Sequence, residues 1–539
     1  GEVMRYLNPK QPKQAFQFLL NSPYVVDKTG ILSTLAPFIN VENRFVCVTR
    51  PRRFGKTVNA NIIACFLARG LDATGLFEGT IVSHDSQAMQ HLGNHDVIYL
   101  DFSQMPASCE TYADYIGSFS QGIVDDLRMT WPQARLPEGI GVVQAFEELY
   151  IQLDRSFVFV IDEWDSMFFN LKFTQDDQQS FLMFLKQLLK GRPYVELAYM
   201  TGILPIAKHS TGSELNMFVE YSAADDPKFE RFFGFTEDEV RGLCKVHEQR
   251  VSSPRVTYDG LAFWYDGYLN DDGGRRFNPR SVVLALADDA LKSYWTDSGP
   301  YDEIYYYIEH DVAAVRDDVV RLVAGEKVPV RLVGYAASAM SLTTKDEIFS
   351  AMVVYGFLTY HDGYVSIPNH ELMLQFERVL GKEKMGYVAR LAQRSEEMLA
   401  ATLHGDTPVM CEIIQAAHDQ EVPLLRYANE SDLAALVNLV YLAARDRYDV
   451  RREEPCGRGI ADVAFVPRDS VDPTTPPFIV ELKAGGTVEE ALGQIKARGY
   501  AARFRDGLLG TVSPQPPLAV AIVWDPKNKV HDCAVERLG

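Results

Sequence analysis

The sequence predicts an α/β multidomain protein whose first domain is a parallel sheet with helices on both faces. Two apolar runs, 45–49 and 156–161, each end in polar residues, as strands buried on both faces do. Segments with helical apolar spacing stand between and after these runs, and strands that alternate with helices are typical of a parallel sheet. The 539 residues, 47% of them hydrophobic, are enough for about three domains of ~150 residues.

The first run opens into a pattern that binds phosphates. It is followed by RPRRFGKT and then by an apolar-periodic helix. In such a loop the glycine lets backbone N–H groups approach a phosphate, the lysine reaches the outer phosphates and the threonine hydroxyl binds Mg²⁺. Gly55, Lys56 and Thr57 fill these positions. Arg50 stands where the usual pattern has its first glycine, so a surface turn that happens to contain Gly-Lys-Thr is the alternative.

The second run leads directly into Asp162 and Glu163. A carboxylate at a strand end can hold the Mg²⁺ of a bound nucleotide through water, and the neighbouring glutamate can take the proton of the attacking water. Either acid alone could instead cap a helix. A further strand, 195–200, ends at Thr201, whose hydroxyl either senses the terminal phosphate or caps the next turn. The carboxyl ends of parallel strands meet at one edge, so we expect these residues to lie together.

Charge is unevenly distributed along the chain. The net charge is −20, but from Arg426 onward the sequence contains 15 basic and 16 acidic residues, so nearly all the negative charge lies before that point. A nucleic-acid contact is therefore more plausible at the C-terminal end. The seven cysteines are scattered and form no CxxC pair, which predicts a reducing cytoplasm. No apolar run approaches about 18 residues, so neither a membrane span nor a secretory leader is expected.

The region after Phe235 reads as mostly helical. Thr236 and Glu239 form a capping pattern at the start of a helix. Residues 355–368 predict a β-hairpin that turns at Asp362-Gly363, and helices closed by such a hairpin resemble a winged helix. Arg275, Arg276 and Arg280 could reach a phosphate from this region, but a solvated face is the better interpretation.

A second group of chemically suited residues lies near the C-terminus. Asp462 belongs to one strand pattern and Glu481 to the next, so pairing of the two strands brings the carboxylates side by side. Lys483 follows Glu481 by two residues and shares its face of the strand. Asp462 and Glu481 can hold Mg²⁺ or Mn²⁺ against a scissile phosphate, while Lys483 orients or deprotonates the attacking water. A helix predicted over 487–504 follows.

Several motifs in one order give a family resemblance. RPRRFGKT, IDEWD (161–165), TGI (201–203), GFTEDEV (234–240), YDGY (265–268) and NPRS (278–281) resemble the prokaryotic AAA-ATPase-like proteins, which usually carry a C-terminal nuclease domain of the PD-(D/E)XK superfamily. RPRRFGKT is itself the form of the phosphate loop in that family, which accounts for Arg50. The resemblance covers nearly the whole chain.

The resemblance implies three domains: an ATPase domain at 1–235, a helical middle domain with a winged-helix-like part at 236–425, and a restriction-endonuclease-like domain at 426–539. It implies an ATP site made of Arg53, Gly55, Lys56, Thr57, Asp162 and Thr201, with Mg²⁺ held by Thr57 and Asp162 and with Glu163 as the base. In the nuclease superfamily a helical glutamate and a glutamine support the metal site, and Glu430 and Gln494 stand at those positions, with Glu454 as a rival to Glu430.

The sequence therefore predicts an ATP-binding and ATP-hydrolysing protein whose metal-dependent nuclease domain cuts nucleic acid, with DNA the expected substrate, under control of the nucleotide state. The alternative is a slow-hydrolysing, ATP-loaded signalling or scaffold switch whose nuclease-like domain binds a partner. A homo-oligomer is expected because nucleotide sites of related ATPases are often completed by a neighbouring subunit. A helicase is disfavoured, since no stacking platform for a single strand is found.

Overall fold

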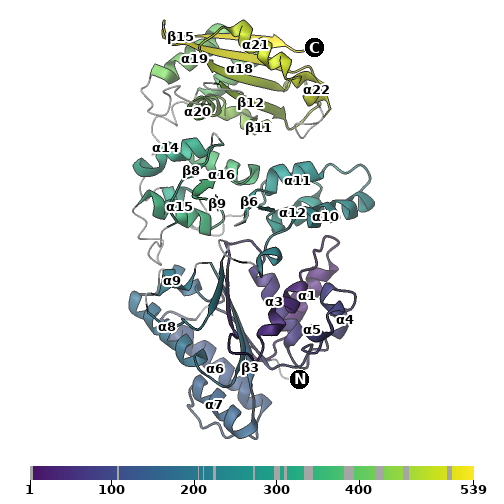
Figure 1. Cartoon of the computed structure of the whole chain (residues 1–539), viewed down its shortest axis with the longest axis vertical. Coiled ribbons are helices and arrows are strands. Elements are labelled where there is room, and N and C mark those ends of the chain that lie inside the picture. The colour runs from purple at the N-terminus through teal and green to yellow at the C-terminus, as the bar shows by residue number, and fades with distance from the viewer. Residues whose placement is uncertain are drawn as a thin grey trace.

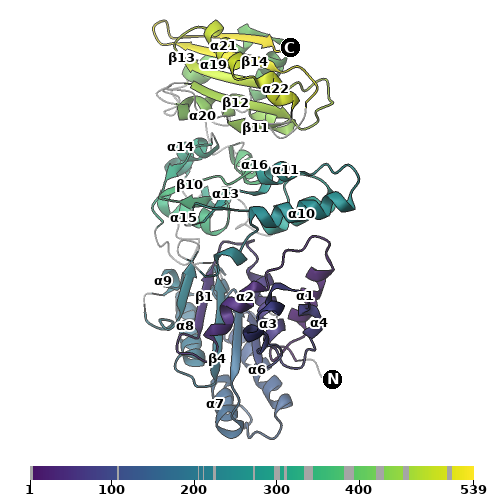
Figure 2. The same ribbon diagram turned by 45° about the vertical axis from the view of Figure 1, so that its right-hand side comes forward.

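The chain forms three parts that follow one another along the long axis of the molecule (Figure 1). In this view and in the one turned by 45° (Figure 2), the middle part lies between the N-terminal and C-terminal parts. The computed structural model describes residues 4–539 except 106–107, 171, 204, 211, 223–225, 227, 271–272, 296–303, 309–311, 324, 333–343, 381–393, 420–429, 453–459 and 507–512.

The N-terminal part is built on a five-stranded sheet of order β2-β3-β4-β1-β5, in which every pair is parallel. Its strands are β1 (Phe45–Thr49), β2 (Val97–Asp101), β3 (Phe157–Asp162), β4 (Val195–Gly202) and β5 (Val219–Ser222). The predicted parallel sheet is confirmed. The short strand β5 was not predicted, because four residues with one exposed end give little pattern.

Helices cover both faces of this sheet, as the apolar strands require. Val46 and Val48 point into a core shared with α1 and α3, whereas Phe45 and Cys47 point into a second core formed with α6, α7 and α8. The helices are α1 (Gln11–Asn21), α2 (Gly30–Leu35), α3 (Lys56–Leu67), α4 (Thr74–Phe77), α5 (Ser86–Met89), α6 (Tyr112–Thr130), α7 (Val142–Leu153), α8 (Gln175–Leu189) and α9 (Ile206–His209), with short 3₁₀ turns η1 (Ala36–Phe38), η2 (Ile81–His84), η3 (Ser166–Phe169) and η4 (Glu230–Phe232).

The middle part is mostly helical. It contains α10 (Glu237–Arg250), α11 (Tyr258–Tyr265), α12 (Pro279–Asp288), α13 (Ile304–Ile308), α14 (Val312–Val323), α15 (Lys345–Val354) and α16 (His370–Leu380), the pair β6 (Tyr268–Leu269) and β7 (Arg275–Arg276), and a sheet of β8 (Val328–Pro329), β9 (Thr359–His361) and β10 (Tyr364–Ser366). The capping box of Thr236 and Glu239 is confirmed. So is the hairpin, whose turn residues Asp362 and Gly363 have φ of 50° and 85°.

The C-terminal part is a mixed sheet of order β11-β12-β13-β14-β15, in which only β13 and β14 are parallel. Its strands are β11 (Tyr448–Arg452), β12 (Ile460–Pro467), β13 (Phe478–Ala484), β14 (Leu518–Asp525) and β15 (Val530–Arg537). The associated helices are α18 (Ser395–His404), α19 (Thr407–Asp419), α20 (Glu430–Val440), η8 (Leu442–Asp446), α21 (Val488–Ala497) and α22 (Tyr500–Arg505). Two helices that precede residue 426 contact elements of this part, since α19 packs on β15 and α18 on α20.

The helix predicted over 487–504 is two helices. Thr487 caps α21 as the pattern suggests, but the chain turns at Gly499, where φ is 66°, before α22 begins. The left-handed conformation is open to glycine at little cost and ends the first helix there. Because α21 ends before Gly499, its last residues lie at a helix end, and the helix packs on β13 and β14.

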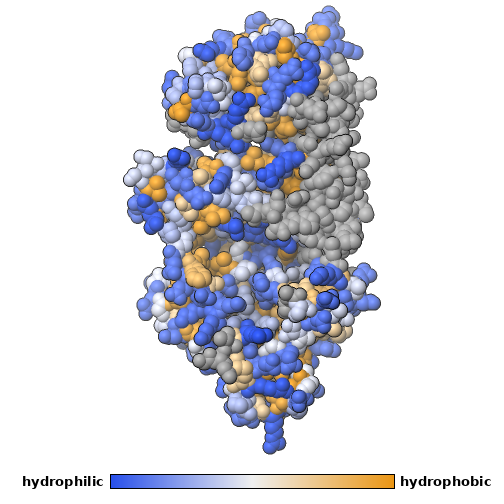
Figure 3. Space-filling model, turned by 180° about the vertical axis from the view of Figure 1, so that it is seen from behind, coloured by the Kyte–Doolittle hydropathy of each residue, from blue (hydrophilic) through white to orange (hydrophobic). Residues whose placement is uncertain are grey.

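The surface seen from behind is largely hydrophilic, with hydrophobic residues scattered in small groups (Figure 3). Among the helices in the described ranges, none combines the length and apolar character needed to cross a membrane.

Candidate functional site

The phosphate loop joins β1 to α3 at the carboxyl edge of the parallel sheet. Gly55 precedes the first residue of α3 and has φ of 87°. A Cβ built on Gly55 would meet nothing within 4 Å, so the left-handed backbone, and not lack of space, is what favours glycine. The loop therefore delivers the N-terminus of a twelve-residue helix to this edge, where backbone N–H groups favour an anion.

Asp162 lies at the end of β3 between two hydroxyl groups. Thr57 Oγ1 donates to Asp162 Oδ2 at 2.7 Å, and Thr201 Oγ1 donates to Asp162 Oδ1 at 2.5 Å. Burial raises the pKa of Asp162 to about 6, although both hydrogen bonds act to lower it. The structure thus brings together the loop threonine, the β3 acid and the β4 threonine, three residues that are far apart in the sequence.

Glu163 is placed by its backbone beside the same threonine. Its φ is 49°, and its N–H donates to Thr201 Oγ1 at 3.0 Å. The side chain is half-buried, whereas Asp162 is fully buried. Thr201 therefore bridges the two acids, because its hydroxyl accepts from the Glu163 backbone N–H and donates to the Asp162 carboxylate. The Glu163 side chain is the more accessible of the two acids.

Lys56 is nearly inaccessible, with 5% exposure. Its Nζ donates to the carbonyl of Arg50 at 2.8 Å and to that of Pro51 at 3.4 Å. Burial lowers the pKa of Lys56, while the carboxylates of Glu163, Asp165 and Asp162 act to raise it. The amine is thus held inside the loop, facing the acids of the sheet edge.

Arg50, which replaces the first glycine of the usual pattern, has a structural role. Its guanidinium donates to the carbonyls of Thr49 and Tyr221 at 2.7 and 2.9 Å and forms an ion pair with Asp226. It also lies 5.0 Å from the ring centroid of Phe233. Arg50 therefore ties the end of β1 to the end of β5 and to the segment after it.

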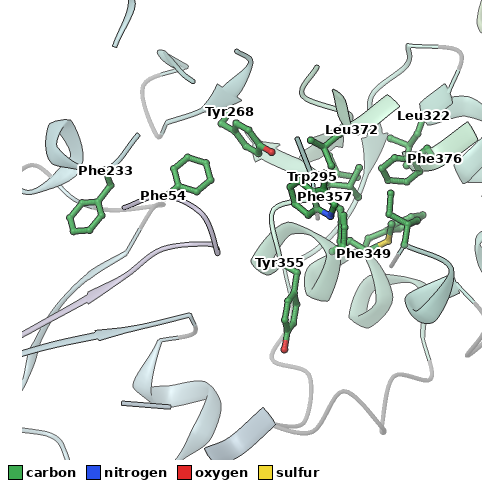
Figure 4. Packing of buried hydrophobic residues seen from close by; sticks show 14 of the residues in the cluster. Phe54, Phe233, Tyr268, Trp295, Leu322, Phe349, Tyr355, Phe357, Leu372 and Phe376 are labelled. Carbon is green, nitrogen blue, oxygen red and sulfur yellow. The ribbon is translucent and has the colours of Figure 1, made fainter. Parts of the chain in front are cut away.

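The three loop side chains that follow Pro51 reach into the middle part of the chain. The guanidinium carbon of Arg52 lies 4.8 Å from the ring centroid of Tyr355, and that of Arg53 lies 3.8 Å from the centroid of Trp295. Phe54 packs edge-on against Tyr268 at 4.8 Å (Figure 4). The guanidinium of Arg53, for which an ATP contact is expected, lies over this tryptophan of the middle part.

A cavity of about 140 Å³ opens beside the loop, between the N-terminal and middle parts. Its walls include Arg50, Pro51, Phe54, Phe233, Tyr268 and Tyr360. The cavity is thus partly aromatic, and residues of both the phosphate loop and the middle part line it.

In the C-terminal part, β12 and β13 pair antiparallel with Asp462 directly opposite Glu481, as predicted. Alternate residues of these strands face opposite cores, so Asp462, Glu481 and Lys483 share the face covered by α21 and α22. The two carboxylates are 3% and 0% exposed. Within the described residues, none of their four oxygens accepts a well-formed hydrogen bond, although the guanidinium of Arg498 lies against them. Such buried acceptors fit a cation.

Lys483 and Gln494 flank this pair. Lys483 Nζ lies 3.4 Å from Glu490 Oε2, at the start of α21. Gln494 Oε1 is buried and, within the described residues, accepts no hydrogen bond. Burial raises the pKa of Glu481 to about 7, against the lowering effect of Lys483.

Arg498, which the sequence analysis does not assign to any site, lies at this one. Its Nη1 contacts the carboxylate of Asp462 and lies 3.4 Å from Glu481 Oε1. Its position four residues after Gln494 on a helix was the available signal, since residues so spaced share a face.

Two expected contributors cannot be placed at the site. Glu430 is the first residue of α20, and the structure does not describe its side chain. Glu454 and the Gly-Arg-Gly segment lie outside the described residues. No group of three or more His, Cys, Asp or Glu suited to a metal occurs in the part of the chain that is described. Mg²⁺ can be held by one or two carboxylates together with water and substrate phosphate, so the pair Asp462 and Glu481 fits it.

Comparisons with known proteins give two similar solved structures and one family match. Among solved structures, the chain is similar to a Walker-type ATPase of Pyrococcus abyssi, with 10% identity, 68% of this chain and 95% of that chain covered and a TM-score of 0.33. It is also similar to the ORC2 protein of Aeropyrum pernix, with 10% identity, 70% and 96% covered and a TM-score of 0.33. No curated protein matches the chain. Residues 14–211, a segment that contains the loop, Asp162 and Thr201, match the family model "Predicted AAA-ATPase".

Proposed function

We propose that the chain is a nucleotide-controlled nuclease, with an ATPase site in the N-terminal part and a metal-dependent phosphodiesterase site in the C-terminal part. The observation that carries the ATPase half is the pair of hydroxyls on Asp162 beside the Gly55-Lys56 loop. The observation that carries the nuclease half is Asp462 paired with Glu481 on a buried face.

At the first site the residues have separable tasks. The N-terminus of α3 and the Lys56 ammonium bind the phosphates, and these phosphates replace the loop carbonyls that Lys56 now contacts. Thr57 and Asp162 hold Mg²⁺, which supplies charge neutralisation of the phosphates. Glu163 takes the proton of the attacking water, and Thr201 fixes both acids. The neighbouring aromatic cavity offers a place for the adenine base of ATP.

At the second site Asp462 and Glu481 hold one or two Mg²⁺ or Mn²⁺ ions, with Gln494 and Glu430 as supporting groups. A divalent metal held there would supply acidification of the attacking water and charge neutralisation of the scissile phosphate. Lys483 orients that water or accepts its proton. The substrate is nucleic acid, and DNA is our proposal; contacts to the backbone would come from the basic residues of this near-neutral end of the chain.

Contacts through the middle part offer a route between the sites. Arg52, Arg53 and Phe54 of the phosphate loop stack on middle-part aromatics. At the other end, His370 Nε2 lies 3.1 Å from Asp449 Oδ1 on β11, the strand beside β12. A bound phosphate that reorders the loop would disturb the contacts of these three loop residues with the middle-part aromatics. Coupling then requires that the middle part has two arrangements that the nucleotide distinguishes.

The test measures ATP hydrolysis and metal-dependent cleavage in one preparation. Lys56→Ala should abolish hydrolysis, whereas Lys190→Ala, which removes an exposed amine bonded to Ser213 and Asn216, should not. Asp462→Asn should abolish cleavage and leave hydrolysis in place. Hydrolysis that survives Lys56→Ala, or cleavage that survives Asp462→Asn, would contradict the corresponding assignment.

A second candidate is an ATP-loaded switch that hydrolyses slowly and uses the C-terminal part to bind a partner. Arg498 favours it, because the guanidinium already pairs with Asp462 and lies 3.4 Å from Glu481 Oε1. The large negative charge before Arg426 suits protein partners. This candidate predicts no Mn²⁺ binding that depends on Asp462.

A further inference from the structure

We propose that Arg498 is an internal counter-cation of the nuclease site, which gives up its position to the divalent metal and then binds the substrate phosphate. The inference rests on the proposed nuclease function of the Asp462 and Glu481 pair. It adds an order of events in which metal binding precedes the arginine's contact with nucleic acid.

The guanidinium occupies the place where a shared metal would lie. Its Nη1 contacts Asp462 and is 3.4 Å from Glu481 Oε1, so one cationic group bridges both carboxylates. A metal ion held by Asp462 and Glu481 would need the same space. The bridging arginine and a bridging metal are therefore mutually exclusive.

The charge balance of the buried face points the same way. Two carboxylates with exposures of 3% and 0%, which accept no well-formed hydrogen bond within the described residues, are costly unless a cation is near. Lys483 places its amine near Glu490, at 3.4 Å. Arg498 is thus the cation in contact with both acids, and a divalent ion entering there would repel it.

Arg498 can leave without unfolding the helix. It is the C-cap residue that follows the last residue of α21, its side chain is 20% exposed, and Gly499 follows in the left-handed conformation. A rotamer change would carry the guanidinium from the carboxylates toward solvent while the backbone stays in place. A guanidinium beside a metal-bound phosphate can form two parallel hydrogen bonds with it, a geometry that lysine lacks.

The first experiment measures Mn²⁺ affinity without nucleotide or DNA, by calorimetry, in the wild type, Arg498→Gln, Lys496→Gln and Asp462→Asn. Lys496 is the matched control, because it removes one positive charge from the same helix but pairs with Glu536 at 2.6 Å. The Asp462-dependent affinity should rise at least about tenfold in Arg498→Gln, because the competitor is gone. In Lys496→Gln it should stay within about twofold, because an exposed charge is screened.

The outcomes separate two failures. If Mn²⁺ binds the wild type in an Asp462-dependent way and Arg498→Gln binds it equally or less tightly, the counter-cation role is wrong while the metal site stands. If no form binds Mn²⁺ through Asp462, the proposed nuclease site fails and the inference with it. Circular dichroism and melting curves of each variant show whether it is folded.

The second experiment measures DNA affinity with Ca²⁺, an oxygen-binding ion, at saturation and without metal. Wild-type affinity should increase with the metal, and the increase should be at least about threefold smaller in Arg498→Gln than in Lys496→Gln. An equal increase in both variants would overturn the phosphate contact of Arg498.

Discussion

The two sites of this chain both place a buried carboxylate on a strand, but they satisfy it differently. Asp162 accepts hydrogen bonds from Thr57 and Thr201, and so both of its oxygens have partners within the fold. Within the described residues, Asp462 and Glu481 accept no well-formed hydrogen bond, and the guanidinium of Arg498 lies against both carboxylates. The first site is already ordered by neighbouring strands and is ready for an anion with its metal. The second site is arranged around a cation.

The comparison predicts that the side chain of Glu163 is needed for catalysis at the first site but not for the hydrogen bonds that order the site. Glu163→Gln should lower the ATP hydrolysis rate by about 10²–10⁴-fold, because the general base is lost. ATP affinity should change little, since the Glu163 backbone N–H still donates to Thr201. Single-turnover hydrolysis and nucleotide-binding measurements check the two halves, and a loss of affinity equal to the loss of rate would mean that Glu163 is a binding residue.

At the second site the corresponding group is Lys483. Lys483→Ala should reduce metal-dependent cleavage by about 10²-fold while Mn²⁺ still binds, because the lysine acts on the water and not on the metal. Lys527→Ala removes a lysine from the turn after β14 and serves as the control. Cleavage assays with both variants decide the matter: if Lys483→Ala cleaves as the wild type does, another base must be sought.

The ordering of the first site by hydroxyls can be tested with an isosteric change. Thr201→Val removes the donor to Asp162 and the acceptor for Glu163 N–H, so we expect it to cost about 1–3 kcal/mol of stability. Thr201→Ser retains the hydroxyl and should recover most of that loss. Melting curves of the three proteins show the difference, and a Val variant as stable as the wild type would mean that the hydroxyl bridge contributes nothing.

Between the two sites, the middle part contains a buried acid with a distinct pH dependence. Glu371 accepts hydrogen bonds from Ser281 and the backbone of Tyr294, and burial raises its pKa to about 7. A raised folded-state pKa means that the folded form holds the proton longer, so its stabilising contribution is full below about pH 4.5 and is lost as the pH rises through 7.

Between pH 5 and pH 8 the free energy of unfolding should therefore fall less in Glu371→Gln than in the wild type, by up to about 3 kcal/mol. The melting temperature of the variant should fall less over the same range. Glu248→Gln, at an exposed position of α10, should behave as the wild type does. Identical pH profiles for all three proteins would show that Glu371 is already ionised at pH 5.

The sequence was sufficient where one strand and the loop after it carry the pattern. The run before Gly55, the run before Asp162 and the neighbouring strands of Asp462 and Glu481 were all predicted, because local periodicity and chain order determine them. The long-range partners were not. Arg50 meets Asp226, which lies 176 residues away, and no periodic pattern links the two positions.

Arg498 was missed for a related reason. Its contact with Asp462 depends on where α21 ends, and the sequence pattern ran on through Gly499 as one helix. The stacking of Arg53 on Trp295 likewise depends on how two parts of the chain meet. Such contacts between separate elements follow from packing and are not encoded in local spacing.

The most direct test of the central claim is cleavage of linear, circular, single-stranded and branched DNA and of RNA with Mg²⁺ or Mn²⁺, with and without ATP, by the wild type, Lys56→Ala and Lys483→Ala. The account predicts cleavage that changes with ATP in the wild type, does not respond to ATP in Lys56→Ala, and is lost in Lys483→Ala. Cleavage that is indifferent to ATP and to Lys56 would contradict the control by nucleotide, and no metal-dependent cleavage by any form, with ATP still bound, would favour the partner-binding switch.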